Sequence, residues 1–491
     1  MGQLSADLFA GRPDQLRRVA EQAVEFGAMS RLVIVSNRVQ PPIGEGGSGG
    51  QGGLAVALSA ALRESSGIWF GWSGETTEQF TGHINLQRNF GVTTATIDLE
   101  EQDVDEYYNG YANRTLWPLF HYRMDLAEFE SGFAEGYERV NQRFAETLEP
   151  LIEADDLVWV HDYHMFPLGQ YLRDRGIANR IGFFLHIPWP PYRLLLSLPN
   201  HRQLAETLFA YDVVGFQTRD SLDSFRDYVI QEMGGSFGED GRIIVGDRSI
   251  IAIHCPIGID TDNFVEATRS TAARHAHHRM RESANGREMI IGVDRLDYSK
   301  GLQERFLGYE RLLQQNEKIH GEVFLLQIAP PSRSDVQSYQ EIRASLDSLS
   351  GRINGAYADV EWVPIRYVNR GYPRDRLAGI YRAARIGLVT PLRDGMNLVA
   401  KEYVAAQDPE DPGVLILSRF AGAAEQLTEA LLINPYSAEE IADAIEQALA
   451  MPLEERRERW RACMDNVEKE DVMWWRRRFT AALEAVTQSA A

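Results

Sequence analysis

Cysteine is scarce in this chain. The 491 residues include 2 cysteines, Cys255 and Cys463, which lie far apart in the sequence. That spacing argues against a disulfide framework and gives no thiolate metal-ligand pattern. Because such low cysteine usage is typical of a reducing compartment, we expect a cytoplasmic protein.

The sequence also lacks an apolar run close to the ~20 residues that span a bilayer. Charged residues, among them Asp7, Arg12 and Asp14, occur where a secretory signal needs an apolar stretch. Ala6 stands where the N-myristoylation pattern has Ser or Thr. We therefore expect no membrane partner.

Positive charge is in deficit as well. Lys and Arg number 50 against 71 Asp and Glu, which gives a formal net charge of −21. A surface this acidic repels phosphate backbones, so we expect no nucleic-acid partner. A few clustered Arg and Lys side chains still make a local pocket for an anionic small molecule.

Alternating short apolar runs and helix-length segments are present instead, and this pattern predicts βαβ units with buried parallel strands. The expected strands are residues 32–35, 157–160, 181–185, 213–216, 250–253, 290–293, 323–328, 386–389 and 414–417. A single sheet of that size is unusual, and the polar stretch 260–286 lacks a strand pattern. We place a domain boundary between residues 260 and 288 and predict an α/β fold of two Rossmann-like, doubly wound lobes facing a cleft.

The two ends of the chain are predicted to be helical. Apolar residues at helical spacing over 14–27 predict an amphipathic helix within an N-terminal helical arm, residues 1–30, suited to packing or oligomer contact. The tail from residue 453 to residue 487 is predicted to be helical throughout.

A glycine-rich loop, residues 44–53, follows the first predicted strand and precedes an apolar helix. Backbone N–H groups in this arrangement can hold a phosphate, so the loop is predicted to close over an anionic ligand. A mobile surface loop is the alternative. Dinucleotide binding is disfavoured because the loop is long and the next apolar run ends without an acidic residue for a ribose.

Polar residues follow two of the predicted strands directly. Asp162 comes after the strand at 157–160, and His186 after the strand at 181–185. Open α/β sheets place ligand-contacting residues there, so both are candidate partners for sugar hydroxyl groups, with structural hydrogen bonding as the alternative. His161 and His164 lack a third ligand nearby, so no metal is expected.

The strongest basic signal is Arg295 with Lys300, immediately after the strand at 290–293. At a strand end beside a helix that starts at Leu302, these groups can neutralise a diphosphate. The alternative is a solvated salt bridge with Asp294 or Asp297. The sequence has no Gly-Lys-Ser/Thr of a Walker motif, which removes the main support for ATP hydrolysis.

Further sites follow the later strands. Arg333 repeats the layout of a strand followed by arginine, and Asp394 or Asn397 is predicted to cap a helix after the strand at 386–389. Free N–H groups at the start of that helix suit sugar hydroxyls or phosphate. Glu402, further along the helix, could bind both hydroxyl groups of a ribose. Considered alone, Glu402 would be interpreted as a carboxylate on the helix surface. Tyr107, Tyr108, Tyr111 and Trp117 to Tyr122 form an aromatic cluster that, taken alone, favours a core role.

Together these motifs resemble the trehalose-6-phosphate synthases of glycosyltransferase family 20. The matching segments are Ser36-Asn37-Arg38, Gly52-Gly53-Leu54, Tyr107-Tyr108-Asn109, Leu116-Trp117-Pro118, His161-Asp162-Tyr163-His164, Phe184 to Pro188, Arg295 to Gly301, Ser332-Arg333 and Asp394 to Glu402. The match runs from about residue 31 to about residue 480. It departs in the N-terminal arm and at Trp189-Pro190-Pro191.

The resemblance implies a retaining GT-B glycosyltransferase without a cofactor. Such an enzyme transfers glucose from a nucleoside-diphosphate glucose to C1 of glucose 6-phosphate and makes trehalose 6-phosphate. UDP-glucose is the expected donor. Residues 31–265 would form the acceptor lobe, 266–470 the donor lobe, and 471–491 a C-terminal helix returning to the first lobe. A homo-oligomer, tetramer or dimer, and a downstream trehalose-6-phosphate phosphatase are also implied.

The resemblance assigns roles to the candidate residues. Arg295 and Lys300 would hold the diphosphate and stabilise the leaving group, and Asp162 and His186 would orient the acceptor and donor sugars. The other donor-site residues would be Gly53, Asp394, Gly395, Met396, Asn397, Leu398, Val399 and Glu402. The other acceptor-site residues would be Arg38, Tyr108, Trp117 and Arg333. A front-face route is implied, in which the leaving phosphate oxygen takes the acceptor proton.

Three alternatives remain open at this point. One is an enzyme of the same fold with another phosphorylated acceptor, such as a glucosylglycerol-phosphate synthase. A second is a non-catalytic sugar-phosphate sensor, although every motif residue is present. A third, a glycoside hydrolase, would leave the phosphate-binding Arg and Lys without a role.

Overall fold

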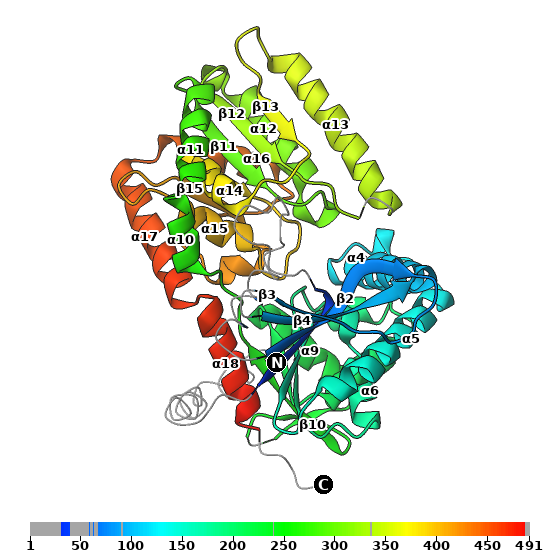
Figure 1. Cartoon of the computed structure of the whole chain (residues 1–491). Helices are drawn as coiled ribbons and strands as arrows, with labels where there is room; N and C mark the ends of the chain where they lie inside the picture. Colours follow the sequence, from blue (N-terminus) through cyan, green and yellow to red (C-terminus); the bar gives the residue numbers. More distant parts are fainter. Residues whose placement is uncertain are drawn as a thin grey trace, which may run out of the picture.

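The structure, a computed structural model, describes residues 31–39, 58, 62, 67–89, 92–238, 240–333 and 336–486. The predicted N-terminal arm, residues 1–30, and the glycine-rich loop with Gly53 lie outside the described residues. Figure 1 shows two α/β lobes, one above the other, each built around its own sheet. The predicted class, two doubly wound α/β lobes, is confirmed.

The N-terminal lobe contains a 10-stranded sheet in the order β3-β4-β2-β1-β5-β6-β7-β10-β9-β8. Its strands are β1 (Leu32–Arg38), β2 (Gly67–Thr77), β3 (Asn85–Asn89), β4 (Val92–Glu100), β5 (Leu157–His161), β6 (Arg180–Leu185), β7 (Val213–Phe216), β8 (Ser236–Phe237), β9 (Ile243–Val245) and β10 (Arg248–His254). The central strands pair in parallel, and antiparallel pairs occur at the two edges, β3 with β4 and β8–β9–β10.

The C-terminal lobe contains a 6-stranded sheet in the order β13-β12-β11-β14-β15-β16. Its strands are β11 (Glu288–Val293), β12 (Val323–Ile328), β13 (Ile365–Val368), β14 (Ile386–Val389), β15 (Val414–Ser418) and β16 (Leu431–Ile433). All of these pairs are parallel. Every strand expected from the apolar runs is present, because β-branched and aliphatic residues buried on both faces form parallel strands.

Helices cover both faces of the sheets. In the N-terminal lobe they are α3 (Glu101–Asp103), η1 (Val104–Leu116), α4 (Trp117–Phe120), η2 (Met124–Leu126), α5 (Ser131–Leu148), η3 (Glu149–Leu151), η4 (Tyr163–Met165), α6 (Leu168–Asp174), α7 (Tyr192–Leu195), α8 (His201–Thr207), η5 (Leu208–Ala210) and α9 (Arg219–Met233). After β10 come α10 (Thr261–Thr268), α11 (Thr271–Ala284), η6 (Tyr298–Lys300), α12 (Leu302–Gln315), η7 (Glu317–Ile319), α13 (Gln337–Tyr357), α14 (Arg374–Ala383), α15 (Leu398–Ala406), η8 (Gly422–Glu425), α16 (Ala438–Ala450), α17 (Leu453–Lys469) and α18 (Val472–Glu484). The chain changes sheets between β10 and β11, and the two helices there, α10 and α11, pack on α14 of the second lobe.

The tail, predicted to be helical from residue 453 to residue 487, consists of two helices with a break at Glu470 and Asp471. α17 ends at Lys469, and the side chain of Asp471 caps α18 by accepting a hydrogen bond from the backbone N–H of Trp474 at 2.6 Å. The helix is interrupted here because this part of the tail packs against the segment that connects the two lobes. A Cβ atom added at Gly258 would lie 2.2 Å from the carbonyl oxygen of Glu470.

Beyond that break, α18 packs on the sheet of the N-terminal lobe, as the red helix in Figure 1 shows. The ring of Phe479 stacks on Trp159 of β5 with centroids 4.5 Å apart. Gly182 and Gly215 leave room for it, since a Cβ atom at either position would lie 2.6 Å or 2.9 Å from the Phe479 ring. The last helix therefore completes the core of the first lobe.

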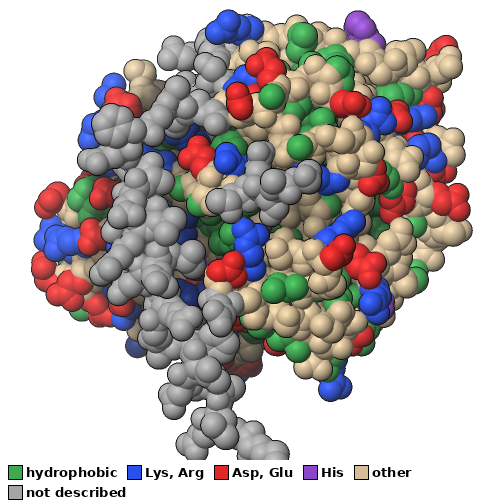
Figure 2. Space-filling model, turned by 90° about the horizontal axis from the view of Figure 1, so that it is seen from below, with side chains coloured by type: hydrophobic (Ala, Val, Ile, Leu, Met, Phe, Trp, Pro, Cys, Tyr) green, Lys and Arg blue, Asp and Glu red, His purple; other side chains and the backbone are tan. Residues whose placement is uncertain are grey.

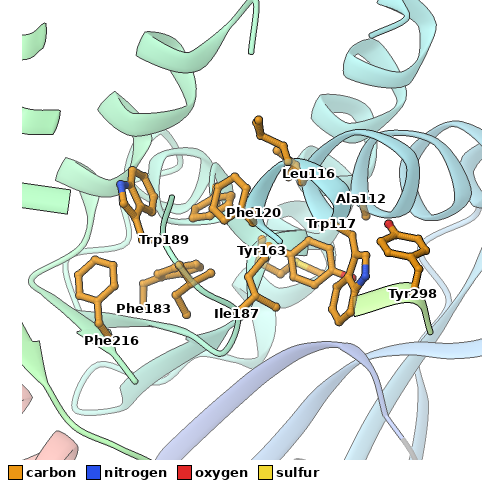
Figure 3. Close-up of a cluster of buried hydrophobic side chains, with 14 of the residues drawn as sticks. Ala112, Leu116, Trp117, Phe120, Tyr163, Phe183, Ile187, Trp189, Phe216 and Tyr298 are labelled. Carbon is orange, nitrogen blue, oxygen red and sulfur yellow. The ribbon is translucent and has the colours of Figure 1, made fainter. Parts of the chain in front are cut away.

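Trp189, where the sequence departs from the family, belongs to the core of the N-terminal lobe. Its ring is fully buried and lies edge-on to Phe225 and Phe120, with centroids 5.1 Å and 5.6 Å apart. Figure 3 shows it on the Phe183 and Phe216 side of this cluster, away from Trp117. Trp189 therefore adds apolar contacts to the core of the N-terminal lobe.

Acidic and basic side chains are interspersed over the described part of the face seen in Figure 2. Among the described residues, none of the helices has the length and apolarity that crossing a membrane requires.

Candidate functional site

The carboxyl ends of the two parallel sheets meet at one interface between the lobes. Arg295 follows β11 and Arg333 follows β12, and their guanidinium carbons lie 5.9 Å and 3.9 Å from the ring centre of Trp117 in the other lobe. A Cβ atom added at Gly395 would lie 2.0 Å from the carbonyl oxygen of His186. Only glycine permits this close approach, so the Gly395 position fixes how near the lobes come.

On the C-terminal side, an ion pair joins two predicted donor-site residues. The Lys300 ammonium lies 2.6 Å from Oδ2 of Asp394, and both side chains are largely buried. Lys300 thus forms its salt bridge with Asp394. The alternative from the sequence analysis was a salt bridge with Asp294 or Asp297. Asp294 instead pairs with buried Arg305 at 2.7 Å.

Asn397 caps the helix that follows. Its Oδ1 accepts a hydrogen bond from the backbone N–H of Ala400 at 3.1 Å, and its Nδ2 donates to Asp394 at 3.1 Å. Of the two predicted caps, Asn397 is therefore the right one. The first N–H groups of a helix have no partner within it, so α15 directs the half-buried backbone of Leu398 and Val399 toward this site as an anion-binding or hydroxyl-binding end. Met396, just before the cap, is buried.

Arg333 is held in one orientation by two tyrosines. Its backbone has a φ of 48°, which is uncommon for a non-glycine residue. Its guanidinium donates to the hydroxyl groups of Tyr339 and of Tyr163, the latter at 3.1 Å. The Tyr339 hydroxyl in turn donates to Asp297 at 3.0 Å. Burial raises the pKa of Asp297, but the charges of Arg333, Lys300 and Arg295 outweigh it and hold that pKa at about 2.

Arg38, the other predicted phosphate ligand, is exposed at the end of β1. Its guanidinium carbon lies 5.6 Å from the ring centre of Trp72, which is edge-on to Tyr108. Tyr108 stacks on His164 with centroids 6.0 Å apart. This row of rings, which continues from His164 to Tyr163, connects Arg38 to Arg333.

Asp162 follows β5 with a φ of 76°, a strained conformation for a residue with a side chain. Its Oδ1 accepts a hydrogen bond from the backbone N–H of His186 at 3.1 Å. Burial raises the pKa of Asp162 to about 6, against the opposing effect of Arg333 and Arg295 from the other lobe. This carboxyl group can therefore change its charge in the neutral range.

Both ring nitrogens of His186 already have protein partners. Nε2 lies 3.0 Å from Nδ1 of His161, and the amide nitrogen of Gln217 lies 3.1 Å from Nδ1. Gln217 is itself fixed because its oxygen accepts from the backbone N–H of Ile257 at 2.8 Å. Burial lowers the pKa of His186 to about 3, so the ring is neutral. The His186 ring thus makes the structural hydrogen bonds that the sequence analysis gave as the alternative to sugar binding. The backbone carbonyl oxygen of His186 faces Gly395.

Glu402 and its neighbour Lys401 face different surroundings on α15. Burial raises the pKa of Glu402 to about 7, while Arg374 lowers it. Lys401 is fully buried and donates to the carbonyl oxygen of Ile257 at 2.8 Å. Burial lowers the pKa of Lys401 to about 7. Glu402 is therefore a half-buried carboxyl group, which suits a hydroxyl-rich ligand better than the solvated helix surface that was its alternative.

Comparisons with known proteins decide the family. The sequence profile described as Glycosyltransferase family 20 matches residues 30–485. The chain belongs to glycosyltransferase family 20. It is 50% identical to a trehalose-6-phosphate synthase of Sinorhizobium fredii over 93% of this chain and 99% of that protein.

Solved structures agree with this family membership. A Burkholderia xenovorans α,α-trehalose-phosphate synthase (UDP-forming), solved in complex with glucose-6-phosphate, is 48% identical with a TM-score of 0.90 and covers 93% of this chain and all of that one, 100%. An E. coli protein solved bound with UDP-2-fluoro glucose is 44% identical with a TM-score of 0.89 and covers 93% and 100% of the two chains. The two lobes are those of the GT-B fold.

In this family 20 glycosyltransferase, most of the predicted site residues come together at the interface. Those within the described part of the chain are Arg38, Tyr108, Trp117, Asp162, His186, Arg295, Lys300, Arg333, Asp394 to Val399 and Glu402. Sequence reasoning missed the residues that hold them, above all Tyr339 and Gln217. Tyr339 lies inside helix α13, where no sequence signal marks it, whereas Gln217 directly follows the predicted strand 213–216 and so had the same placement signal as Asp162 and His186.

Proposed function

We propose that this protein is an α,α-trehalose-phosphate synthase. It transfers glucose with retention from UDP-glucose to C1 of glucose 6-phosphate and releases UDP and trehalose 6-phosphate. Relatives named for this activity, similar to this chain over nearly its whole length, support the proposal.

The observation that carries it is the placement of several basic groups near one half-buried carboxyl group, that of Asp162. Lys300 with Arg295 suits a diphosphate, and Arg333 with the Trp117 ring suits a phosphorylated sugar. Asp162 lies close enough to Arg333 and Arg295 for their charges to lower its pKa. Two anionic substrates that react with each other need this arrangement.

The ion pair of Lys300 with Asp394 has a role in the proposed reaction. Asp394 binds hydroxyl groups of the donor glucose, and Lys300 with Arg295 stabilises the charge that builds on the leaving diphosphate. A double-displacement route needs a carboxylate nucleophile, and Asp394 is bound to Lys300 and Asn397. This favours front-face transfer, in which the leaving phosphate oxygen takes the acceptor proton while an oxocarbenium-like state is stabilised.

The setting of the enzyme is part of the same proposal. A cytoplasmic location fits the two buried, unpaired cysteines, Cys255 and Cys463. Family kinship supports a homo-oligomer, a tetramer or dimer, and a trehalose-6-phosphate phosphatase that consumes the product.

Product analysis tests this function. The purified protein is incubated with glucose 6-phosphate and, separately, UDP-, ADP- and GDP-glucose, and the products are examined by mass spectrometry and NMR. We expect α,α-trehalose 6-phosphate, formed fastest from UDP-glucose. Transfer to glycerol 3-phosphate in a competition assay would indicate a glucosylglycerol-phosphate synthase, and binding of both substrates without product would indicate a sensor.

A further inference from the structure

His121, at the end of α4 and outside every role assigned so far, has one ring nitrogen without a partner. Its Nδ1 lies 2.7 Å from the carbonyl oxygen of Trp117. A carbonyl oxygen only accepts, so Nδ1 carries the proton and Nε2 presents a lone pair. Nε2 is buried and has no hydrogen-bond partner among the described residues, and burial lowers the pKa of His121 to about 4. The ring is thus a neutral, unsatisfied acceptor, and leaving such a group buried is costly.

The His121 ring faces the donor side of the interface. It packs on the Trp117 ring with centroids 4.1 Å apart. Its charged neighbours are Asp297, Lys300 and Asp394, all from the C-terminal lobe. The indole N–H of Trp117 is also buried without a partner among the described residues. Two adjacent rings, one with a free donor and one with a free acceptor, fit a ligand rich in hydroxyl groups.

The backbone after His121 is fixed by contacts across the interface. Tyr122 has a φ of 62°, a left-handed conformation that is strained in a residue with a side chain. The guanidinium carbon of Arg393 lies 4.1 Å from the Tyr122 ring centre, and that of Arg123 lies 5.4 Å from the ring centre of Tyr298. These contacts from both lobes hold the turn, and with it the orientation of His121.

We propose that Nε2 of His121 accepts a hydrogen bond from a hydroxyl group of the glucose that is transferred. This inference rests on the proposed function and deepens it. A neutral acceptor suits a hydroxyl group and offers nothing to a phosphate, which only accepts. The donor glucose is the sugar concerned, because Lys300 and Asp394, which His121 faces, are the donor-site ion pair.

Deoxy donor analogues combined with a variant test the proposal. His121→Phe keeps the ring on Trp117 and removes the acceptor. On UDP-glucose we expect kcat/KM to fall about 10- to 100-fold, the cost of an unpaired buried hydroxyl. We expect the kcat/KM of the wild-type protein to be lower by a similar factor, relative to UDP-glucose, on one of the four UDP donors that carry 2-, 3-, 4- or 6-deoxyglucose. On that donor alone, His121→Phe has no further effect, because the hydrogen bond is already absent.

A matched control histidine, His320, lies in the C-terminal lobe, away from the interface residues named above. His320 places Nε2 2.8 Å from the carbonyl oxygen of Leu313 and stacks on Trp362 with centroids 6.0 Å apart. His320→Phe therefore removes the same kind of histidine-to-carbonyl hydrogen bond from a stacked ring. We expect it to change thermal stability and to leave the relative rates on the deoxy donors as in the wild type.

A measurement on the unmodified ring keeps the proposal testable if His121→Phe does not fold. In protein labelled with ¹⁵N-histidine, we expect UDP-glucose to shift the Nε2 resonance of His121 and UDP alone to leave it in place. His121→Gln assigns the resonance.

Two results would overturn the proposal. One is that His121→Phe lowers the rate by the same factor on all four deoxy donors. The other is that UDP alone produces the full shift. Absence of trehalose 6-phosphate with the wild-type protein would instead count against the proposed function.

Discussion

The two sides of the lobe interface are built from different chemistry. The C-terminal side contributes charges that are already paired, such as Lys300 with Asp394 at 2.6 Å. The N-terminal side contributes neutral rings, such as His186 and Trp117, and one carboxyl group, Asp162, whose pKa is raised to about 6 by burial. One side is thus set up for charge and the other for hydroxyl groups.

This difference shows how an acidic protein holds two anions. Its net charge is −21, yet the site places arginine and lysine where phosphates are expected and balances them internally with Asp394 and Asp297. Lys300 and Arg333 therefore each have a carboxylate partner within the protein.

The largest effect is expected on the charged side. Lys300→Ala should lower kcat about 100- to 1,000-fold, because it removes a donor to the leaving diphosphate. Steady-state kinetics with saturating donor measure this, and thermal unfolding reports folding. Lys318→Ala, at an exposed position on η7, is the control and should retain wild-type turnover. Near-wild-type activity of Lys300→Ala would remove the diphosphate role.

On the neutral side, Asp162→Asn should reduce kcat/KM for glucose 6-phosphate about 10- to 100-fold at pH 7.5. The carboxylate form of Asp162 is lost as the pH falls through about 6, so the ratio of wild-type to variant activity should shrink between pH 7.5 and 5. The substrate phosphate titrates in the same range, but it does so equally for both proteins. A ratio that does not change with pH contradicts the role of the ionised carboxylate.

Glu402→Gln separates two effects of a charged group on the C-terminal side, its effect on protein stability and its effect on donor binding. Burial raises the folded-state pKa of Glu402 to about 7 from an unfolded value near ~4.3, so the folded state favours the protonated form. Stability is then greatest below the unfolded pKa and is lost as the pH rises through about 7.

We expect Glu402→Gln to raise the Tm of the ligand-free protein at pH 8 and to change it little at pH 4.5. The same variant should raise the KM for the donor, because an amide replaces the carboxylate that we propose accepts two ribose hydroxyls. Glu361→Gln, an exposed change, serves as the control in the same differential scanning experiments. An equal Tm shift at both pH values would contradict burial as the cause.

The smallest effect is expected from the helix cap. Asn397→Ala removes the hydrogen bond to the backbone of Ala400 and keeps a Cβ atom at a φ of 87°, which alanine adopts less readily than asparagine, so it should lower the free energy of unfolding by about 1–3 kcal/mol. Asn397→Gly loses only the cap and should cost less. Urea denaturation compares them, and equal losses would show that the left-handed backbone is not strained.

Most of the strands that the sequence predicted are buried on both faces, and several of the missed ones are short or half exposed, although β2 and β4, which are long, were missed as well. β11 and β12 are buried along almost their whole length, whereas β13 is mostly half-buried and β8 has exposed residues at both positions. Local hydrophobicity identifies the first kind. Pairing at a sheet edge depends on neighbours that are distant in the sequence, so it leaves a weak local signal.

The site shows the same limit. Motifs identified groups that are proposed to face the ligands, such as Lys300 and Asp394, but not that these two residues, 94 positions apart, are bonded to each other. Gln217 was missed because its function is to hold His186 through a contact that only the fold creates. Residues that position others have no chemistry of their own for a sequence pattern to reveal.

The place of Phe479 has a consequence for synthesis of the chain. Its ring fills the space above Gly182 and Gly215 in the N-terminal sheet, yet the whole C-terminal lobe is translated before it. The first lobe therefore emerges from the ribosome with an apolar strip uncovered and keeps it so until the last helix is made. In this chain the two lobes cannot mature in simple order from N-terminus to C-terminus, and a nascent chain stalled within α17 should be a client for chaperones that bind apolar surface.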